Sequence, residues 1–161
     1  MIFLGIDPGQ TGAIGYMYER TLGERFYGVH DMPVLGNTLD AKGVHDLLIG
    51  LTDGWRAEDC FICIEEAITM PQQGARQRAV TAQNYGILIG VLACIRLSYS
   101  PVRPATWKRK LGLLRQDKYA SVVKAIELFP TAPLTRKKDH GRAEALLLAW
   151  YARTTLYARE P

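Results

Sequence analysis

Three acidic residues stand at points of the sequence where a carboxylate needs a partner. Asp7 ends an apolar run at the N-terminus, and Glu65 ends a second apolar run at 60–64. Glu144 interrupts an apolar segment, as either a cap-region surface residue or a residue that faces a metal. A carboxylate in such surroundings is costly unless it is paired or bound to a cation. Asp7 either caps a turn or shares a metal with Glu65 on a neighbouring strand, because like charges repel unless a divalent cation lies between them.

Neighbouring residues offer alternatives for the ligand set. Glu66 follows Glu65, and adjacent residues of a strand point to opposite faces, so we expect one of the two to face the site. The spacing does not decide which. His140 precedes Glu144 by four residues and shares its face of a helix that starts near His140. His140 is thus a ligand or a surface histidine, and Asp139 is a ligand or the N-cap of that helix.

Acids at the ends of separate elements suit phosphodiester hydrolysis by two metal ions. Mg²⁺ prefers such hard oxygens; one ion activates water and the other stabilises the leaving oxygen, so the protein needs no nucleophile of its own. The sequence has no Ser-His-Asp elbow, no G-x-x-x-x-G-K-[ST] loop and no G-x-G-x-x-G motif. Cys60-x-x-Cys63 does not indicate a zinc or redox site, because residues i and i+3 of a strand point to opposite faces.

The charge distribution indicates a polyanionic partner. The chain of 161 residues has a formal net charge of +4, yet the segment 101–142 has 11 basic and three acidic residues. A basic segment on a near-neutral body favours nucleic acid. Met70, in the polar segment after Glu66, is a candidate wedge between base steps or part of a plain surface loop. The candidate phosphate contacts are Arg76, Arg78, Lys108, Arg115, Lys118, Lys137 and Lys138.

The hydrophobic pattern predicts the elements that position these residues. Strands are expected at 1–7, 13–18, 24–30, 60–65 and 98–103, with a hairpin turn at 19–23. Helices are expected at 40–51, 74–95, 106–111, 117–129 and 142–156, with a basic loop at 131–139. This alternation indicates an α/β layered fold with one domain, 1–161. Gly86 and Gly90 share a helix face, which we interpret as close packing on the sheet or on a second subunit.

The composition excludes several classes of protein. With 48% hydrophobic and 22% charged residues, the chain is not expected to be disordered. No stretch is long and apolar enough to span a bilayer, and the N-terminus lacks the basic leader and cleavage site of a signal peptide. Three cysteines, an odd number with no secretion signal, indicate free thiols in a reducing compartment.

Three motifs in order, GIDPG at 5–9, IEE at 64–66 and HGRAEA at 140–145, resemble the RuvC family of Holliday-junction resolvases, above all the RuvC-like proteins of phages. The resemblance covers essentially the whole chain and includes YGILIG at 85–90 and PATWK at 104–108. It implies an RNase H-like fold, with a mixed five-stranded sheet and helices on both faces. It also implies a homodimer, Mg²⁺ or Mn²⁺ dependence, symmetric nicking of four-way DNA junctions, and a bacterial or phage-infected host cytoplasm.

The resemblance also assigns site residues. The acidic ligands that it implies are Asp7, Glu65 and Glu144, and the DNA contacts are Lys108 and Lys118. The fourth ligand departs from the pattern: bacterial relatives have an Asp three positions before the last acid, where this chain has Gly141. Phage relatives often have an Asp where this chain has His140. His140 is therefore the favoured fourth ligand, with Asp139 as the alternative.

Other classes fit parts of the pattern. The segment 7–12 matches the Asp-x-Gly-x-Thr-Gly element of actin-like ATPases and phosphotransferases. That class needs two such domains around the nucleotide, and this chain has room for one. A catalytically inactive junction-binding protein is expected to lose acids, whereas three motif acids remain here. A nuclease for structured RNA is a further alternative within the same fold.

Overall fold

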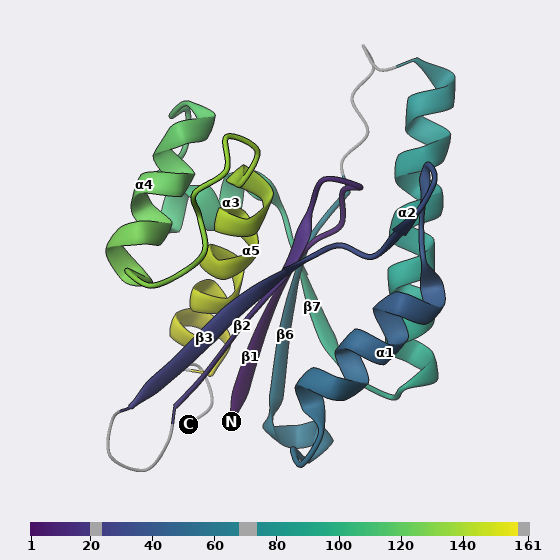
Figure 1. Cartoon of the computed structure of the whole chain (residues 1–161), viewed down its shortest axis with the longest axis horizontal. Coiled ribbons are helices and arrows are strands. Elements are labelled where there is room, and N and C mark those ends of the chain that lie inside the picture. The colour runs from purple at the N-terminus through teal and green to yellow at the C-terminus, as the bar shows by residue number, and fades with distance from the viewer. Residues whose placement is uncertain (20–23, 68–73, 158–161) are drawn as a thin grey trace.

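A mixed five-stranded sheet forms the centre of the protein (Figure 1). The computed structural model describes residues 1–19, 24–67 and 74–157. The strands of the sheet are β1 (Ile2–Asp7), β2 (Ala13–Glu19), β3 (Arg25–Asp31), β6 (Cys60–Glu65) and β7 (Tyr99–Val102). Their order is β3-β2-β1-β6-β7, with β2 antiparallel to β1 and β3, and β6 parallel to β1 and β7. The predicted hairpin turn at 19–23 falls mostly outside the described residues.

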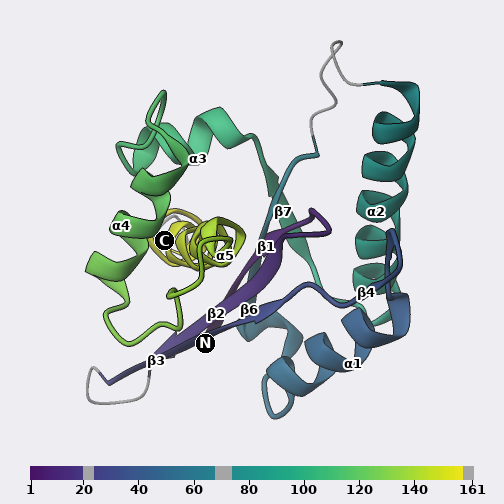
Figure 2. The same ribbon diagram turned by 45° about the horizontal axis from the view of Figure 1, so that its top comes forward.

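Helices cover both faces of the sheet, as predicted (Figures 1 and 2). One face carries α3 (Pro104–Lys110), α4 (Lys118–Leu128) and α5 (His140–Tyr151), and the other carries α1 (Ala41–Thr52) and α2 (Ala75–Cys94). Each face has its own apolar core, because successive strand residues point to opposite sides. Cys63 is buried in the α5 core and Cys60 in the α1–α2 core. The two thiols therefore lie on opposite faces, as expected.

The register of β1 and β6 places two acids side by side. Ile6 of β1 pairs with Ile64 of β6 in a parallel ladder, and Asp7 and Glu65 are the next residues of their strands. Ile6 and Ile64 both point into the α1–α2 core. Because side chains alternate, Asp7 and Glu65 point to the opposite face, which α5 covers.

Two glycines bring the third acid to the same place. A Cβ on Gly5 would lie 2.1 Å from the Ala145 carbonyl oxygen, and a Cβ on Gly15 would lie 2.6 Å from the Ala145 carbonyl carbon. The backbone of α5 thus rests directly on β1 and β2, an approach that a side chain on either strand would prevent. Glu144, which precedes Ala145, is held by this contact near the ends of β1 and β6.

Several boundaries differ from the sequence prediction. The last helix begins at His140 rather than 142, because Asp139 is its N-cap residue and its carbonyl accepts from the Ala143 N–H at 2.9 Å. The helix predicted at 106–111 begins at Pro104, since proline suits the first helical turn. The end of the predicted final helix is a π-helix, Ala152–Leu156. The hairpin of β4 (Val34–Leu35) and β5 (Thr38–Leu39) and the 3₁₀ helix Ala57–Asp59 were not predicted.

The glycines of α2 do not pack on the sheet. A Cβ on Gly86 or Gly90 would meet no atom of the described chain within 4 Å, so the first of the two predicted alternatives is wrong. Among the described residues, we find no helix with the length and apolarity that a membrane crossing requires.

Candidate active site at the strand ends

Asp7 is the central acid of the site. Its Oδ1 accepts a hydrogen bond from the Gly9 N–H at 3.3 Å. A Cβ on Gly141 would lie 3.2 Å from Asp7 Oδ2 and 2.4 Å from the Thr11 carbonyl oxygen, so Asp7 lies against the first turn of α5. Burial raises the pKa of Asp7 from 3.8 to about 6, and the nearby negative charge of Glu144 adds to the rise. The tight contact leaves no room for a side chain at position 141.

Glu65 lies beside Asp7 and accepts a hydrogen bond from a tryptophan. Trp107 Nε1 of α3 donates to Glu65 Oε2 at 2.6 Å. Burial raises the pKa of Glu65 from 4.5 to about 7; the Trp107 hydrogen bond opposes this rise, and the charges of Asp7 and Glu144 add to it. The mutual effects of the three carboxylates indicate that they share one electrostatic environment.

Glu144 is held by two donors from other helices. Ser121 Oγ of α4 donates to Glu144 Oε1 at 3.1 Å, and Lys108 Nζ of α3 lies 2.8 Å from the same oxygen. The side chains of Glu144 and Lys108 are 13% and 28% exposed. The positive charge of Lys108 also lowers the pKa values of Asp7 and Glu65. Lys108, predicted as a phosphate contact, therefore lies inside the acidic cluster.

The structure separates the alternative ligands. His140, the first residue of α5, is half-buried, and its charge acts on Asp7. Asp139 is fully buried but accepts from Arg136, from the backbone N–H and from Nε, both at 2.6 Å. Glu66 lies 3.4 Å from Arg103 Nε. Asp7, Glu65, Glu144 and His140 are thus brought together. Asp139 is bound by Arg136, and Glu66 is paired with Arg103 but also lines a cavity together with Asp7 and Glu65.

The donor set fits a hard divalent cation. In 1–19, 24–67 and 74–157, no three His, Cys, Asp or Glu side chains are already arranged to coordinate one ion. The three carboxylates are nevertheless partly buried, mutually repulsive and short of positive charge, since Lys108 is the one cation paired with them in these ranges. A divalent cation would offset that repulsion, and carboxylate oxygens are the ligands that Mg²⁺ and Mn²⁺ prefer.

A cavity of about 340 Å³ opens beside Asp7 and Glu65. Its far wall is formed by polar residues of α2, where Gln77, Thr81 and Asn84 recur at helical spacing. Asn84 is 3% exposed, and its Oδ1 accepts from the Leu39 N–H at 3.2 Å. Asp7 and Glu65 are therefore accessible from a polar cavity, which Glu66 also lines and Glu144 does not.

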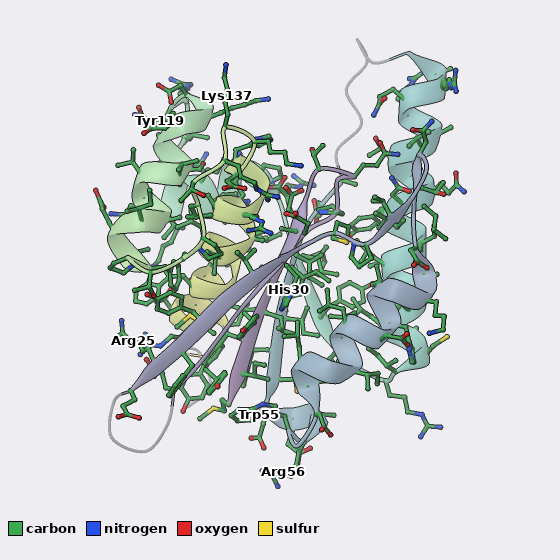
Figure 3. All side chains as sticks on the ribbon, viewed as in Figure 1. Arg25, His30, Trp55, Arg56, Tyr119 and Lys137 are labelled. Carbon is green, nitrogen blue, oxygen red and sulfur yellow. The ribbon has the colours of Figure 1, made fainter. Side chains whose placement is uncertain are left out.

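The other predicted DNA contacts lie around this end of the molecule. Arg76 and Arg78 are exposed in the first turns of α2, and Lys118 is exposed at the start of α4. Lys137, whose side chain points away from the molecule in Figure 3, lies in the loop before α5. Arg115 and Lys138 are also exposed. Met70 lies outside the described residues.

Sequence reasoning missed the residues that hold the acids in place. Trp107 lies in the PATWK segment, and the one sequence feature that could have pointed to it is a single tryptophan in a short basic helix. Ser121 gave no signal. No sequence signal pointed to Asp31 either, which lies outside the acidic site and binds Arg136 at 2.7 and 2.8 Å from a position 105 residues away.

No protein-family model and no curated protein matches the sequence. Solved structures do match. The Thermus thermophilus RuvC structure matches with a TM-score of 0.62 and 18% identity, over 96% of each chain. The chain has the RuvC fold. T. thermophilus RuvC in complex with a Holliday junction substrate gives a TM-score of 0.60 and 15% identity, over 96% of this chain and 97% of that one. The yeast mitochondrial Holliday junction resolvase Ydc2 gives 0.53 and 14%, over 97% and 80%. These matches confirm the predicted fold.

Proposed function

We propose that the protein is a metal-dependent endonuclease that cuts branched DNA, chiefly four-way junctions, by paired symmetric nicks. The observation that carries the proposal is the convergence of Asp7, Glu65 and Glu144 from β1, β6 and α5, with too little positive charge among the described residues to offset them. The RuvC fold and the basic residues around the same end support a DNA substrate.

We assign metal binding and phosphate contacts to different residues of the chain. Asp7, Glu65, Glu144 and His140 would hold two Mg²⁺ or Mn²⁺ ions, which supply an activated water and stabilise the leaving oxygen when bound. Lys108 fixes one oxygen of Glu144 and adds positive charge where a phosphate approaches. The exposed lysines and arginines neutralise phosphates further along the DNA arms and position the scissile bond without reading bases.

Incubation with a mobile four-way junction and Mg²⁺, followed by mapping of nicks on all four strands, tests the proposal. We expect paired nicks at symmetric positions on two opposing strands, none on a linear duplex of the same sequence, and none with Asp7→Asn. Junction binding without nicks under Mg²⁺ and Mn²⁺ would show an inactive binding protein. ATP hydrolysis without nicks would favour the actin-like alternative.

We further propose a homodimer joined through α2. Five small residues recur on its exposed face, namely Ala79, Ala82, Gly86, Gly90 and Ala93. Helices approach each other closely where contact side chains are small, and a two-fold axis would give the two sites that paired nicks need. We expect light scattering at micromolar concentration to give twice 18.0 kDa. Gly86→Glu should give a monomer, whereas Gly50→Glu on the exposed surface of α1 should not.

The three cysteines are all free, with Cys60 and Cys63 buried on opposite faces of the sheet. Free thiols fit a reducing compartment, and we place the protein in the cytoplasm of a bacterium or of a phage-infected host. Fractionation of the native host, with the protein found in the periplasm or medium, would contradict this assignment.

A further inference from the structure

Helix α3 contacts two acids of the candidate site through successive residues. Trp107 is 0% exposed, and its Nε1–H donates to Glu65 Oε2 at 2.6 Å. Lys108 Nζ, on the next residue, lies 2.8 Å from Glu144 Oε1. Glu65 belongs to β6 and Glu144 to α5, so this seven-residue helix bridges acids from two separate elements.

The sheet register explains why Trp107 reaches Glu65. Val102, the last residue of β7, pairs with Glu65, the last residue of β6. Pro104 then starts α3 two residues later, which brings the first turn of the helix over the end of β6. The indole ring packs in the α5 core, so its orientation is fixed by burial rather than by the hydrogen bond alone.

The hydrogen bond acts on one oxygen of the carboxylate. An indole N–H can only donate, and a donor favours the ionised form of the acid that accepts from it. Glu65 Oε1 has no hydrogen-bond partner among the described residues, since the one bond to this side chain goes to Oε2. The ionised group is therefore held at one oxygen and open at the other, which is the arrangement that a metal ligand requires.

From this geometry we propose that Trp107 is a positioning residue: its indole N–H fixes the rotamer of Glu65 so that the open oxygen meets the metal ion. The inference rests on the proposed function. A purely structural role would require only that the buried N–H find some acceptor. That role predicts a loss of stability when the N–H is removed, and no change in metal affinity.

The first test detects the hydrogen bond without any metal. In the ¹⁵N-labelled protein, Trp55, Trp107 and Trp150 give three indole N–H signals. We expect the Trp107 signal to lie downfield and to exchange slowly with solvent, because its N–H is buried against a carboxylate. Glu65→Gln should shift this signal and leave the other two in place. If Glu65→Gln left the chemical shift of the Trp107 indole N–H unchanged, the proposal would be overturned.

The second test measures metal binding directly. Mn²⁺ is titrated into the metal-free protein, with the free ion followed by electron paramagnetic resonance. We expect Trp107→Phe, which keeps the ring but removes the N–H, to weaken Mn²⁺ binding by about 10- to 100-fold. Trp150→Phe is the matched control: Trp150 contacts Phe129, Arg25 and Arg153, away from the acids, and its loss should leave Mn²⁺ affinity unchanged.

The measurements distinguish failure of the positioning role from failure of the proposed function. Trp107→Phe that stays folded and binds Mn²⁺ as tightly as the wild type would overturn the positioning role and leave the proposed function intact. Wild-type protein that binds no Mn²⁺ would refute the proposed function, and the inference with it. If Trp107→Phe does not fold, site-specific replacement of the indole by a benzothiophene, which has sulfur in place of the N–H, keeps the shape and is expected to give the same loss of affinity.

Discussion

Two clusters of carboxylates lie near the first turn of α5, and they differ in how their charge is balanced. In the first, Asp31 and Asp139 are bound by Arg136 and Arg142 through contacts of 2.6 to 2.8 Å. In the second, Asp7, Glu65 and Glu144 face one another with Lys108 as their paired cation. We call these the arginine cluster and the acid cluster.

The pKa values follow the same division. Hydrogen bonds from Arg136 and Arg142 lower the pKa of Asp31, whereas burial raises the pKa of Asp7 to about 6 and that of Glu65 to about 7. A cluster whose charges are balanced inside the chain stabilises the fold at neutral pH. A cluster whose charges are not balanced destabilises it until a cation binds, which is the pattern expected of a functional site. The contrast divides these acids into two groups that the sequence alone did not distinguish, and it supports the proposed metal site at the acid cluster.

The largest expected effect comes from Asp7→Asn. Loss of a residue that only orients a metal ligand costs about 10- to 100-fold in metal-site activity, so removal of a central acid should lower junction cleavage by more than about 100-fold. Junction affinity should be retained, because the phosphate-contacting lysines remain. Rates under saturating Mg²⁺ and affinities in EDTA are the two measurements. Cleavage at the wild-type rate would refute the metal site.

The second comparison uses adjacent residues. Glu65 faces Asp7, whereas Glu66 lies 3.4 Å from Arg103 at the surface. Glu65→Gln should therefore reduce cleavage far more than the matched Glu66→Gln. Single-turnover rates on the same junction measure both variants. Equal effects, or the reverse order, would mean that Glu66 is the ligand.

In the arginine cluster, the expected effect is on stability. Asp139→Asn replaces one of the two fully buried oxygens that accept from Arg136 with an NH₂ donor and removes the negative charge, and loss of such a partner costs about 1–3 kcal/mol. Urea unfolding should show this loss in Asp139→Asn, whereas Asp7→Asn should be as stable as the wild type or more stable in EDTA. A destabilised Asp7→Asn beside an unaffected Asp139→Asn would reverse the assignment of the two clusters.

The two clusters should also respond to pH with opposite signs. The folded-state pKa of Asp7 is raised from 3.8 to about 6, so between these values the folded protein keeps a proton that the unfolded chain has lost. Stability in EDTA should therefore fall as pH rises from about 4 to about 6, and Glu65 extends the fall to about 7. The lowered pKa of Asp31 gives stability that is present above its ordinary 3.8 and lost on further acidification.

Thermal unfolding in EDTA across pH 3 to 8 would measure both slopes. Asp7→Asn should flatten the fall between about pH 4 and pH 6, and Asp31→Asn should reduce the loss on the acid side. Added Mg²⁺ should stabilise the wild type more at pH 7.5 than at pH 5, because it binds the ionised carboxylates. A wild type whose stability rises steadily from pH 4 to pH 7 would contradict the raised pKa values.

The sequence predicted the sheet and its acids because both depend on local patterns. The apolar runs before Asp7 and Glu65 predicted two strands that each end in an acid, whereas the choice of Glu65 over Glu66 came from the resemblance and not from the spacing. Asp31 and Arg136 lie 105 residues apart, and no local pattern pairs them. The Trp107–Glu65 bond depends on the exact start of α3, and helix ends are set by tertiary contacts as much as by the residues themselves. Long-range polar pairs were therefore the part that the sequence could not supply.

The smallest expected effects separate the two lysines that were predicted to act alike. Lys108 contacts Glu144 at 2.8 Å, whereas Lys118 is exposed at the start of α4. Lys118→Ala should weaken binding to every junction sequence alike, lower the slope of log affinity against log salt by about one, and leave the single-turnover rate unchanged. Lys108→Ala should also slow the chemical step, because it frees Glu144 Oε1 and removes positive charge from beside Asp7 and Glu65. Affinity over a salt series and saturated cleavage rates distinguish the two. If Lys118→Ala changed the preferred cut sequence while the salt slope stayed the same, Lys118 would read a base edge rather than a phosphate.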